Sequence, residues 1–153
     1  MTDELTVPAE AAPDVANKLP VGVRIDLLEN AMAALPQIDH RLTHRFTPGM
    51  YIRQIIMPKG SIYTSKIHKT EHPYVVLSGL VSVMREDGTW EHISGGHFGI
   101  TKPGTRRVLA VHEETTWLTF HATDETDLEK IEQHVIEPHD FRNTLNQEDV
   151  WLG

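Results

Sequence analysis

The feature that most restricts the fold of this chain is a regular alternation of short hydrophobic segments and turn residues from His44 to His121. Within the segments, apolar residues recur at every second position, which is the period of a β-strand with one buried face. Glycine and proline punctuate the segments, and Asp87 with Gly88 forms the strongest hairpin signal. This pattern predicts an all-β domain of the jelly-roll barrel type, with strands near residues 44–46, 51–57, 62–68, 74–77, 80–85, 90–93, 97–101, 106–111 and 117–121.

Helical patterns flank the predicted strands. From residue 23 to 35, apolar residues fall at helical spacing and Pro36 stops the run, which predicts a short amphipathic helix. After the last strand, Thr126 and Glu129 have the spacing of a capping box, and Pro138 ends the apolar period that follows. We therefore expect one helix before the barrel and one after it.

The length of 153 residues is that of one ordinary domain. Residues 1–22 are rich in alanine, proline and acid without a hydrophobic period, which is typical of an arm that does not order itself alone. We expect a single domain over residues 23–137 and a polar tail over 138–153. Strand edges in such a domain need protection by barrel closure or by pairing between subunits, so we also predict a homo-oligomer, most simply a two-fold dimer joined through the arm or an edge strand.

The charge and the amino-acid composition exclude several classes of partner and site. The 22 acidic and 14 basic residues give a net charge of −8, which argues against binding to nucleic acid or to an anionic membrane. There is no cysteine, so disulfides and thiolate metal sites are excluded, and histidine and carboxylates remain as metal ligands. No basic leader or membrane-length apolar run is seen, and we expect a soluble, cytoplasmic protein.

Two histidines flank one predicted turn. His68 closes a strand and His72 opens the next, so both imidazoles can point to the same side of the hairpin. Neutral imidazole is a good ligand for first-row transition metals such as Zn, Fe, Mn or Ni. The pair therefore predicts a site for one divalent metal, and the alternative is a metal-free polar mouth.

The same segment resembles the first motif of the cupin superfamily, in which glycines flank a His-x-His pair and a glutamate. Gly60 and Gly79 match the glycines and His68 the second histidine, while Lys66 stands at the first histidine and His72 at the glutamate. The resemblance implies a cupin-type jelly roll with a ligand site inside the barrel mouth.

A second stretch resembles the other cupin motif. Gly96, Pro103 and Gly104 follow its pattern, with the proline displaced by one position, and Arg107 replaces its histidine. Because two ligand positions of the family are changed, its three-histidine, one-glutamate site is incomplete here. We expect the third protein ligand to be His121 or else Glu71, with the remaining positions open to water or substrate.

The replaced positions also suggest how a substrate binds. If Arg107 enters the barrel, its guanidinium offers a fork for a carboxylate or phosphate beside the metal, whereas on the surface it would pair with a nearby glutamate. We assign Lys66, Tyr63 and Tyr74 to substrate binding together with it.

Three functions fit these features. The first is a metal-dependent isomerase, lyase or hydrolase acting on an anionic metabolite or sugar derivative, and the second is a binding module with the same pocket and no turnover. The third is a structural component of a phage particle or other assembly, with the terminal arms reaching neighbouring subunits. The motifs around His68, Arg107 and His121 are similar to small cupin-like proteins of tailed bacteriophages and bacteria, which supplies such a setting. In that case the protein would be located in the virion.

Overall fold

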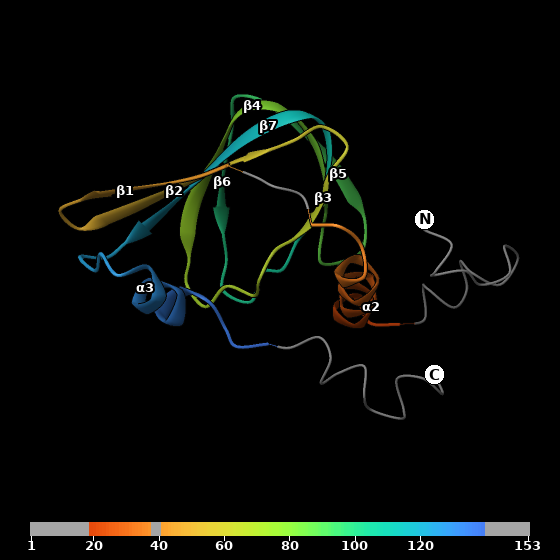
Figure 1. Cartoon of the computed structure of the whole chain (residues 1–153), viewed down its shortest axis with the longest axis horizontal. Helices are drawn as coiled ribbons and strands as arrows, with labels where there is room; N and C mark the ends of the chain where they lie inside the picture. The colour runs from red at the N-terminus through yellow and green to blue at the C-terminus, as the bar shows by residue number, and fades with distance from the viewer. Residues whose placement is uncertain (1–18, 38–40, 140–153) are drawn as a thin grey trace, which may run out of the picture. The chain divides into compact units, whose positions relative to one another are not determined.

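The computed structural model describes residues 19–37 and 41–139. They belong to two compact units, one that contains helix α2 (Val21–Ala33) and one that contains residues 41–139 (Figure 1). Most of the predicted arm and tail lies outside the described residues. The helix predicted at 23–35 is present but begins directly after Pro20. Neither helix in the described ranges has the length and hydrophobicity that crossing a bilayer requires.

The second unit is an antiparallel sheet of seven strands, which confirms the predicted all-β class with one helix before the strands and one after them. The strands pair in the order β1-β2-β7-β4-β5, with β3 also paired to β7 and β6 to β4. Their bounds are β1 Arg41–Thr47, β2 Met50–Met57, β3 Ile62–Thr64, β4 His72–Met84, β5 Trp90–Ser94, β6 His97–Thr101 and β7 Val108–Ala122.

Two of the predicted breaks between strands are absent, so seven strands replace the nine expected. Residues 74–77 and 80–85 belong to one strand, β4, and the expected turn at Gly79 is a bulged stretch where the register against β7 shifts. Gly79 has φ +109° there, and such irregularities bend a strand without ending it. Likewise, β7 runs continuously through the predicted gap between 111 and 117.

The sheet is curved (Figure 1). Its inner face forms the hydrophobic core of this unit. Side chains of alternate residues on β2, β4, β5 and β7 meet there, as the period-2 pattern predicts. The buried members are Ile55, Met57, Tyr74, Val76, Val81, Val83, Ile93, Leu109, Val111 and Trp117.

Helix α3 (Leu128–Val135) closes one side of this unit. Its N-cap is Asp127, whose carboxylate accepts a hydrogen bond of 3.0 Å from the backbone of Glu129, whereas the capping box had predicted Thr126. Ile131 and Val135 pack on Tyr51 of β2 in a second, smaller cluster. The helix thereby lies over the end of the sheet at which the inward-facing side chains become polar.

Candidate functional site

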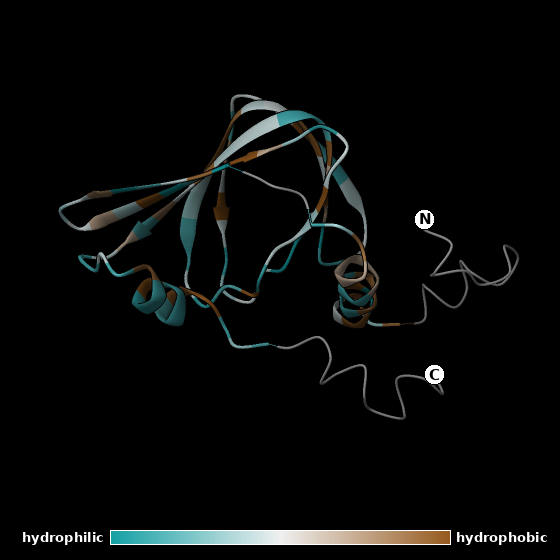
Figure 2. Cartoon of the chain, viewed as in Figure 1, coloured by the Kyte–Doolittle hydropathy of each residue, from teal (hydrophilic) through white to brown (hydrophobic). Residues whose placement is uncertain are grey.

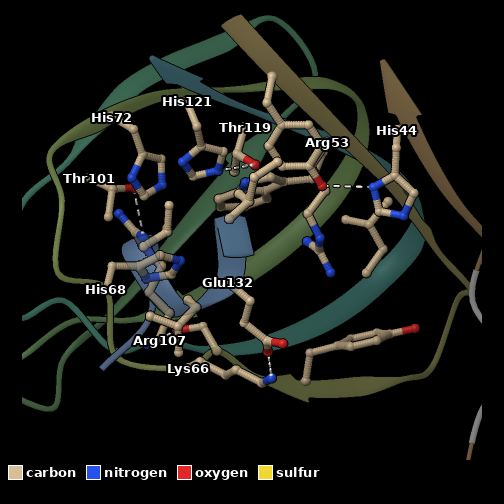
Figure 3. A pocket seen from close by; sticks show the side chains of 18 of the residues that line it. His44, Arg53, Lys66, His68, His72, Thr101, Arg107, Thr119, His121 and Glu132 are labelled. Atoms are coloured by element: carbon tan, nitrogen blue, oxygen red, sulfur yellow. Dashed lines mark hydrogen bonds and ion pairs between the residues drawn. The ribbon is translucent and has the colours of Figure 1, made fainter. Parts of the chain in front are cut away.

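A cavity of about 430 Å³ lies between the inner face of the sheet and α3 (Figure 3). The rows of inward side chains that form the core continue into it, and there they change from apolar to basic. On β2 the row passes from Ile55 to Arg53 and Tyr51, and on β7 from Trp117 through Thr119 to His121. The period-2 alternation of the strands thus places polar groups in an otherwise apolar enclosure.

Three histidines from different parts of the chain meet in this cavity. The imidazole centroids of His68 and His72 are 4.9 Å apart, and those of His72 and His121 are 4.3 Å apart. Strand pairing produces the second contact, because β4 and β7 are aligned with Tyr74 opposite Thr119, and the two histidines lie two residues further along each strand. His72 and His121 are buried and His68 is partly buried.

Burial keeps these imidazoles neutral. Desolvation, with a smaller contribution from neighbouring His72, lowers the pKa of His68 from 6.5 to about 4. Desolvation and the other two histidines lower the pKa of His121 to about 3, and desolvation also lowers that of His72. At neutral pH each ring therefore carries one lone pair, which is the form that accepts a hydrogen bond or binds a metal.

Hydrogen bonds orient two of the rings and leave ring nitrogens available. His72 donates from Nδ1 to the carbonyl of Thr70 at 3.2 Å, which leaves its Nε2 with the lone pair. The Nε2 atom of His121 lies 3.1 Å from the hydroxyl oxygen of Thr119. Within the described residues, the buried Nδ1 atoms of His68 and His121 have no hydrogen-bond partner. Such atoms are costly unless a ligand or water satisfies them.

The three imidazoles have the chemistry of a metal site, but their nitrogens are not arranged around a common point. Among the described residues, no three histidine or carboxylate side chains converge so as to hold one ion. Glu71, the alternative third ligand, is exposed and forms an ion pair with Lys102. Glu71 faces outward because side chains alternate along a strand. Its neighbour His72, which pairs with Thr101, faces inward.

Arg107 enters the cavity and is held in place there. Its guanidinium carbon lies 4.9 Å from the ring centroid of Tyr74, and its Nη1 donates to the hydroxyl of Thr101 at 3.1 Å. Its backbone N–H donates to the side chain of Ser65 at 2.7 Å. Desolvation is the main reason that its pKa is lowered from the ordinary value of a guanidinium group. Tyr74 itself is stacked on Trp117 and lies outside the cavity lining, where it contacts Arg107.

Arg53 is a second cavity arginine, and the sequence analysis did not identify it. Desolvation lowers its pKa, with Tyr51 and Glu132 acting in the opposite direction. The structure gives its guanidinium no hydrogen bond or ion pair within the described ranges. The available signal was its position in β2, where a charged residue interrupts the inward apolar row of Tyr51, Ile55 and Met57.

The remaining predicted residues occupy the rim of the cavity. Tyr63 lines it, and so does Lys66, whose ammonium group forms an ion pair with Glu132 of α3 (Figure 3). His44, which was not predicted as a site residue, also lines it, and its Nδ1 lies 2.7 Å from the hydroxyl oxygen of Tyr51. Tyr51 in turn stacks on His121 with 5.6 Å between centroids, so aromatic rings continue from the rim to the histidine cluster.

Comparison with known proteins identifies similar solved structures that are cupin domains. One is the Cupin_2 domain of an XRE family transcriptional regulator from Enterobacter cloacae, at 15% identity over 56% of this chain and 98% of that one, with a TM-score of 0.46. Another is a cupin-2 domain containing protein from Shewanella frigidimarina, at 10% identity over 67% of this chain and 100% of that one, with a TM-score of 0.45. No protein-family model and no curated protein matches the chain.

Proposed function

We propose that the protein binds a small organic anion, with a carboxylate or phosphate group, in the cavity between β2, β4, β7 and α3. The observation that carries the proposal is the presence of two desolvated guanidinium groups, Arg53 and Arg107, at one enclosed site. Guanidinium groups present fixed pairs of donors that match carboxylate and phosphate oxygens.

The charge balance of the cavity supports an anionic ligand. In a chain with a net charge of −8, the described lining contains three cationic side chains and a single carboxylate, Glu132. That carboxylate forms its ion pair with Lys66 and acts on Arg53 only from a greater distance, so neither arginine has an ion pair within the described lining. Burying an uncompensated charge costs several kcal/mol, so an anion bound between the two would gain from relieving that cost.

A direct test is calorimetric titration of the protein with inorganic phosphate and with small mono- and dicarboxylates. Arg53→Gln and Arg107→Gln each remove one charge from the cavity and are expected to weaken binding about 10- to 100-fold. Arg45→Gln is the matched control, because Arg45 is an exposed residue of the adjacent strand β1, outside the lining. Equal affinity for the parent and both cavity variants would show that the arginines do not hold the ligand.

The histidine cluster supports a second candidate, a divalent first-row metal, which would require the rings of His68, His72 and His121 to rotate, because their nitrogens do not converge as they stand in the described residues. The supporting observation is the pair of buried, unpartnered Nδ1 atoms on neutral rings. A metal bound there would supply a Lewis acid beside the arginines, while Arg53 and Arg107 would bind and orient the anion.

Elemental analysis of protein purified without a histidine tag tests the metal candidate, followed by zinc titration of the chelator-treated protein. The double variant His68→Ala, His72→Ala should lose metal retention, while His134→Ala, at an exposed position of α3, should keep it. Metal-free parent protein that also fails to bind added zinc, nickel or manganese would exclude the metal candidate and leave anion binding intact.

A further inference from the structure

One hydrogen-bond acceptor in the cavity has a position that the backbone fixes. His72 is 3% exposed, and its Nδ1 lies 3.2 Å from the carbonyl oxygen of Thr70. A carbonyl oxygen only accepts hydrogen bonds, so Nδ1 carries the proton of the neutral ring and Nε2 carries the lone pair. The hydrogen bonds of the described residues include none to this Nε2 atom. The lone pair of a cavity-lining imidazole is therefore available to a ligand.

His72 remains an acceptor at neutral pH. Desolvation is the main cause that lowers its pKa, and the positive charge of Arg107 acts in the same direction. Both effects oppose protonation of Nε2, which would turn the acceptor into a donor. A buried acceptor without a donor costs free energy, so a ligand that places a donor at this atom gains affinity from it.

The guanidinium group of Arg107 lies close to this acceptor. His72 and Thr101 are directly opposed on β4 and β6, which places their side chains next to each other on the inner face of the sheet. The Nη1 atom of Arg107 donates to the hydroxyl of Thr101 at 3.1 Å, and Figure 3 shows His72 beside this bond. A guanidinium group has five N–H donors, so the bond to Thr101 leaves others for a carboxylate. A ligand held by Arg107 therefore lies next to His72.

We propose that the anion bound in the cavity is an α-hydroxy acid, with its carboxylate on Arg107 and its hydroxyl donating to Nε2 of His72. This inference rests on the proposed anion-binding function and adds what the anion must carry. An ionised carboxylate contains only acceptors, so it does not satisfy the lone pair of His72. A hydroxyl on the adjacent carbon does. An ammonium group there would also donate, but the charges of Arg53 and Arg107 oppose a further positive charge.

Calorimetric titration of the full chain, treated with a chelator and kept in metal-free buffer, tests the hydroxyl directly. Malate is compared with succinate, and lactate with propionate, because each pair differs only by the α-hydroxyl. The hydroxy acid should bind about 10- to 100-fold more tightly in each pair. Pyruvate carries an oxygen at the same carbon that accepts hydrogen bonds and does not donate them. It should bind within ~3-fold of propionate.

The variant His72→Phe removes the acceptor and keeps an aromatic ring of similar size. It should bring the affinities for malate and succinate to within ~3-fold of each other. His134→Phe is the matched control, because His134 is an exposed residue of α3 outside the cavity lining, and it should keep the preference of the parent for malate. Thermal unfolding verifies that both variants are folded, and the five acids tested on the parent decide the question without either variant.

The outcomes separate this inference from the proposed function. Equal affinities of the parent for malate and succinate would overturn the α-hydroxy acid while leaving anion binding by the arginines intact. Pyruvate that binds as tightly as lactate would overturn it too, because the ligand oxygen would then accept a hydrogen bond. A preference for malate that appears only after addition of zinc would assign the hydroxyl to the metal and overturn the contact with His72. If none of the acids binds, the proposed function fails together with this inference.

Discussion

Acidification from about pH 8 to pH 5 is expected to destabilise the protein through the buried histidines, before most carboxylates are protonated. In the folded chain, His68 and His121 have pKa values of about 4 and about 3, against 6.5 for an unperturbed imidazole. The unfolded state therefore binds more protons than the folded state throughout this range. Stability is fully present above pH 6.5 and falls as the pH decreases toward the folded pKa values.

The size of the effect follows from those pKa values. A histidine with a pKa of 6.5 unfolded and about 4 folded contributes ~2 kcal/mol less to the free energy of unfolding at pH 5 than at pH 8. His121 contributes a similar ~2 kcal/mol, because it also remains neutral in the folded state at pH 5. Together they remove ~4 kcal/mol, a large part of the 5–15 kcal/mol typical of a domain. The lowered pKa of His72 acts in the same direction.

Urea denaturation at each pH, followed by tryptophan fluorescence in the presence of a chelator, measures this loss, since Trp117 is buried in the core. His121→Gln removes one titrating group and should reduce the loss between pH 8 and pH 5 by about half. The control is His134→Gln, which changes an exposed histidine on α3 and should leave the pH dependence unaltered.

Two results would refute this reasoning. One is a parent protein whose free energy of unfolding changes by less than ~1 kcal/mol between pH 8 and pH 5, because then the histidines are not desolvated. The other is a His121→Gln variant with the full pH dependence of the parent, which would assign the effect to other groups.

Three further predictions concern the fold. Gly79→Ala should destabilise the protein by more than ~2 kcal/mol in urea denaturation, because a Cβ at φ +109° would lie 2.4 Å from Thr115 Oγ1 and 2.5 Å from the Glu114 carbonyl oxygen. Gly60 also has a positive φ, +82°, but a Cβ there would lie in open space, so Gly60→Ala should cost less. Equal losses in the two variants would contradict the steric argument. Ile93→Ala, which leaves a cavity in the core, should cost ~2–5 kcal/mol, whereas the exposed Ile62→Ala should cost under ~1 kcal/mol in the same assay. Asp127→Ala should lower the unfolding free energy by ~1 kcal/mol through loss of the α3 cap, and Thr126→Ala should change it little. Thermal denaturation measures both variants, and a larger loss for Thr126→Ala would show that Thr126 is the cap.

Local sequence patterns determined much of the β-structure. Alternating apolar residues predicted the strands of the sheet. Every second side chain of a strand faces the core, and this period does not depend on which strand lies beside it. Local signals did not distinguish a turn from a bulge, since glycine at positive φ serves both, and so the continuous strand through Gly79 was predicted as two. His68 and His72 were recognisable as a pair from their spacing, but the hairpin predicted around them is wrong, because β3 ends at Thr64 and pairs with β7 instead of β4.

Only the tertiary structure decided which distant residues share the cavity. The pairing of β7 with both β2 and β4 brings His121 beside Tyr51 on one side and His72 on the other, and that register depends on contacts between strands far apart in the sequence. The same pairing turns Arg53 inward and Glu71 outward. A shift of one residue would reverse both, because side chains on a strand alternate with a period of two, so the composition of the site is a property of the register.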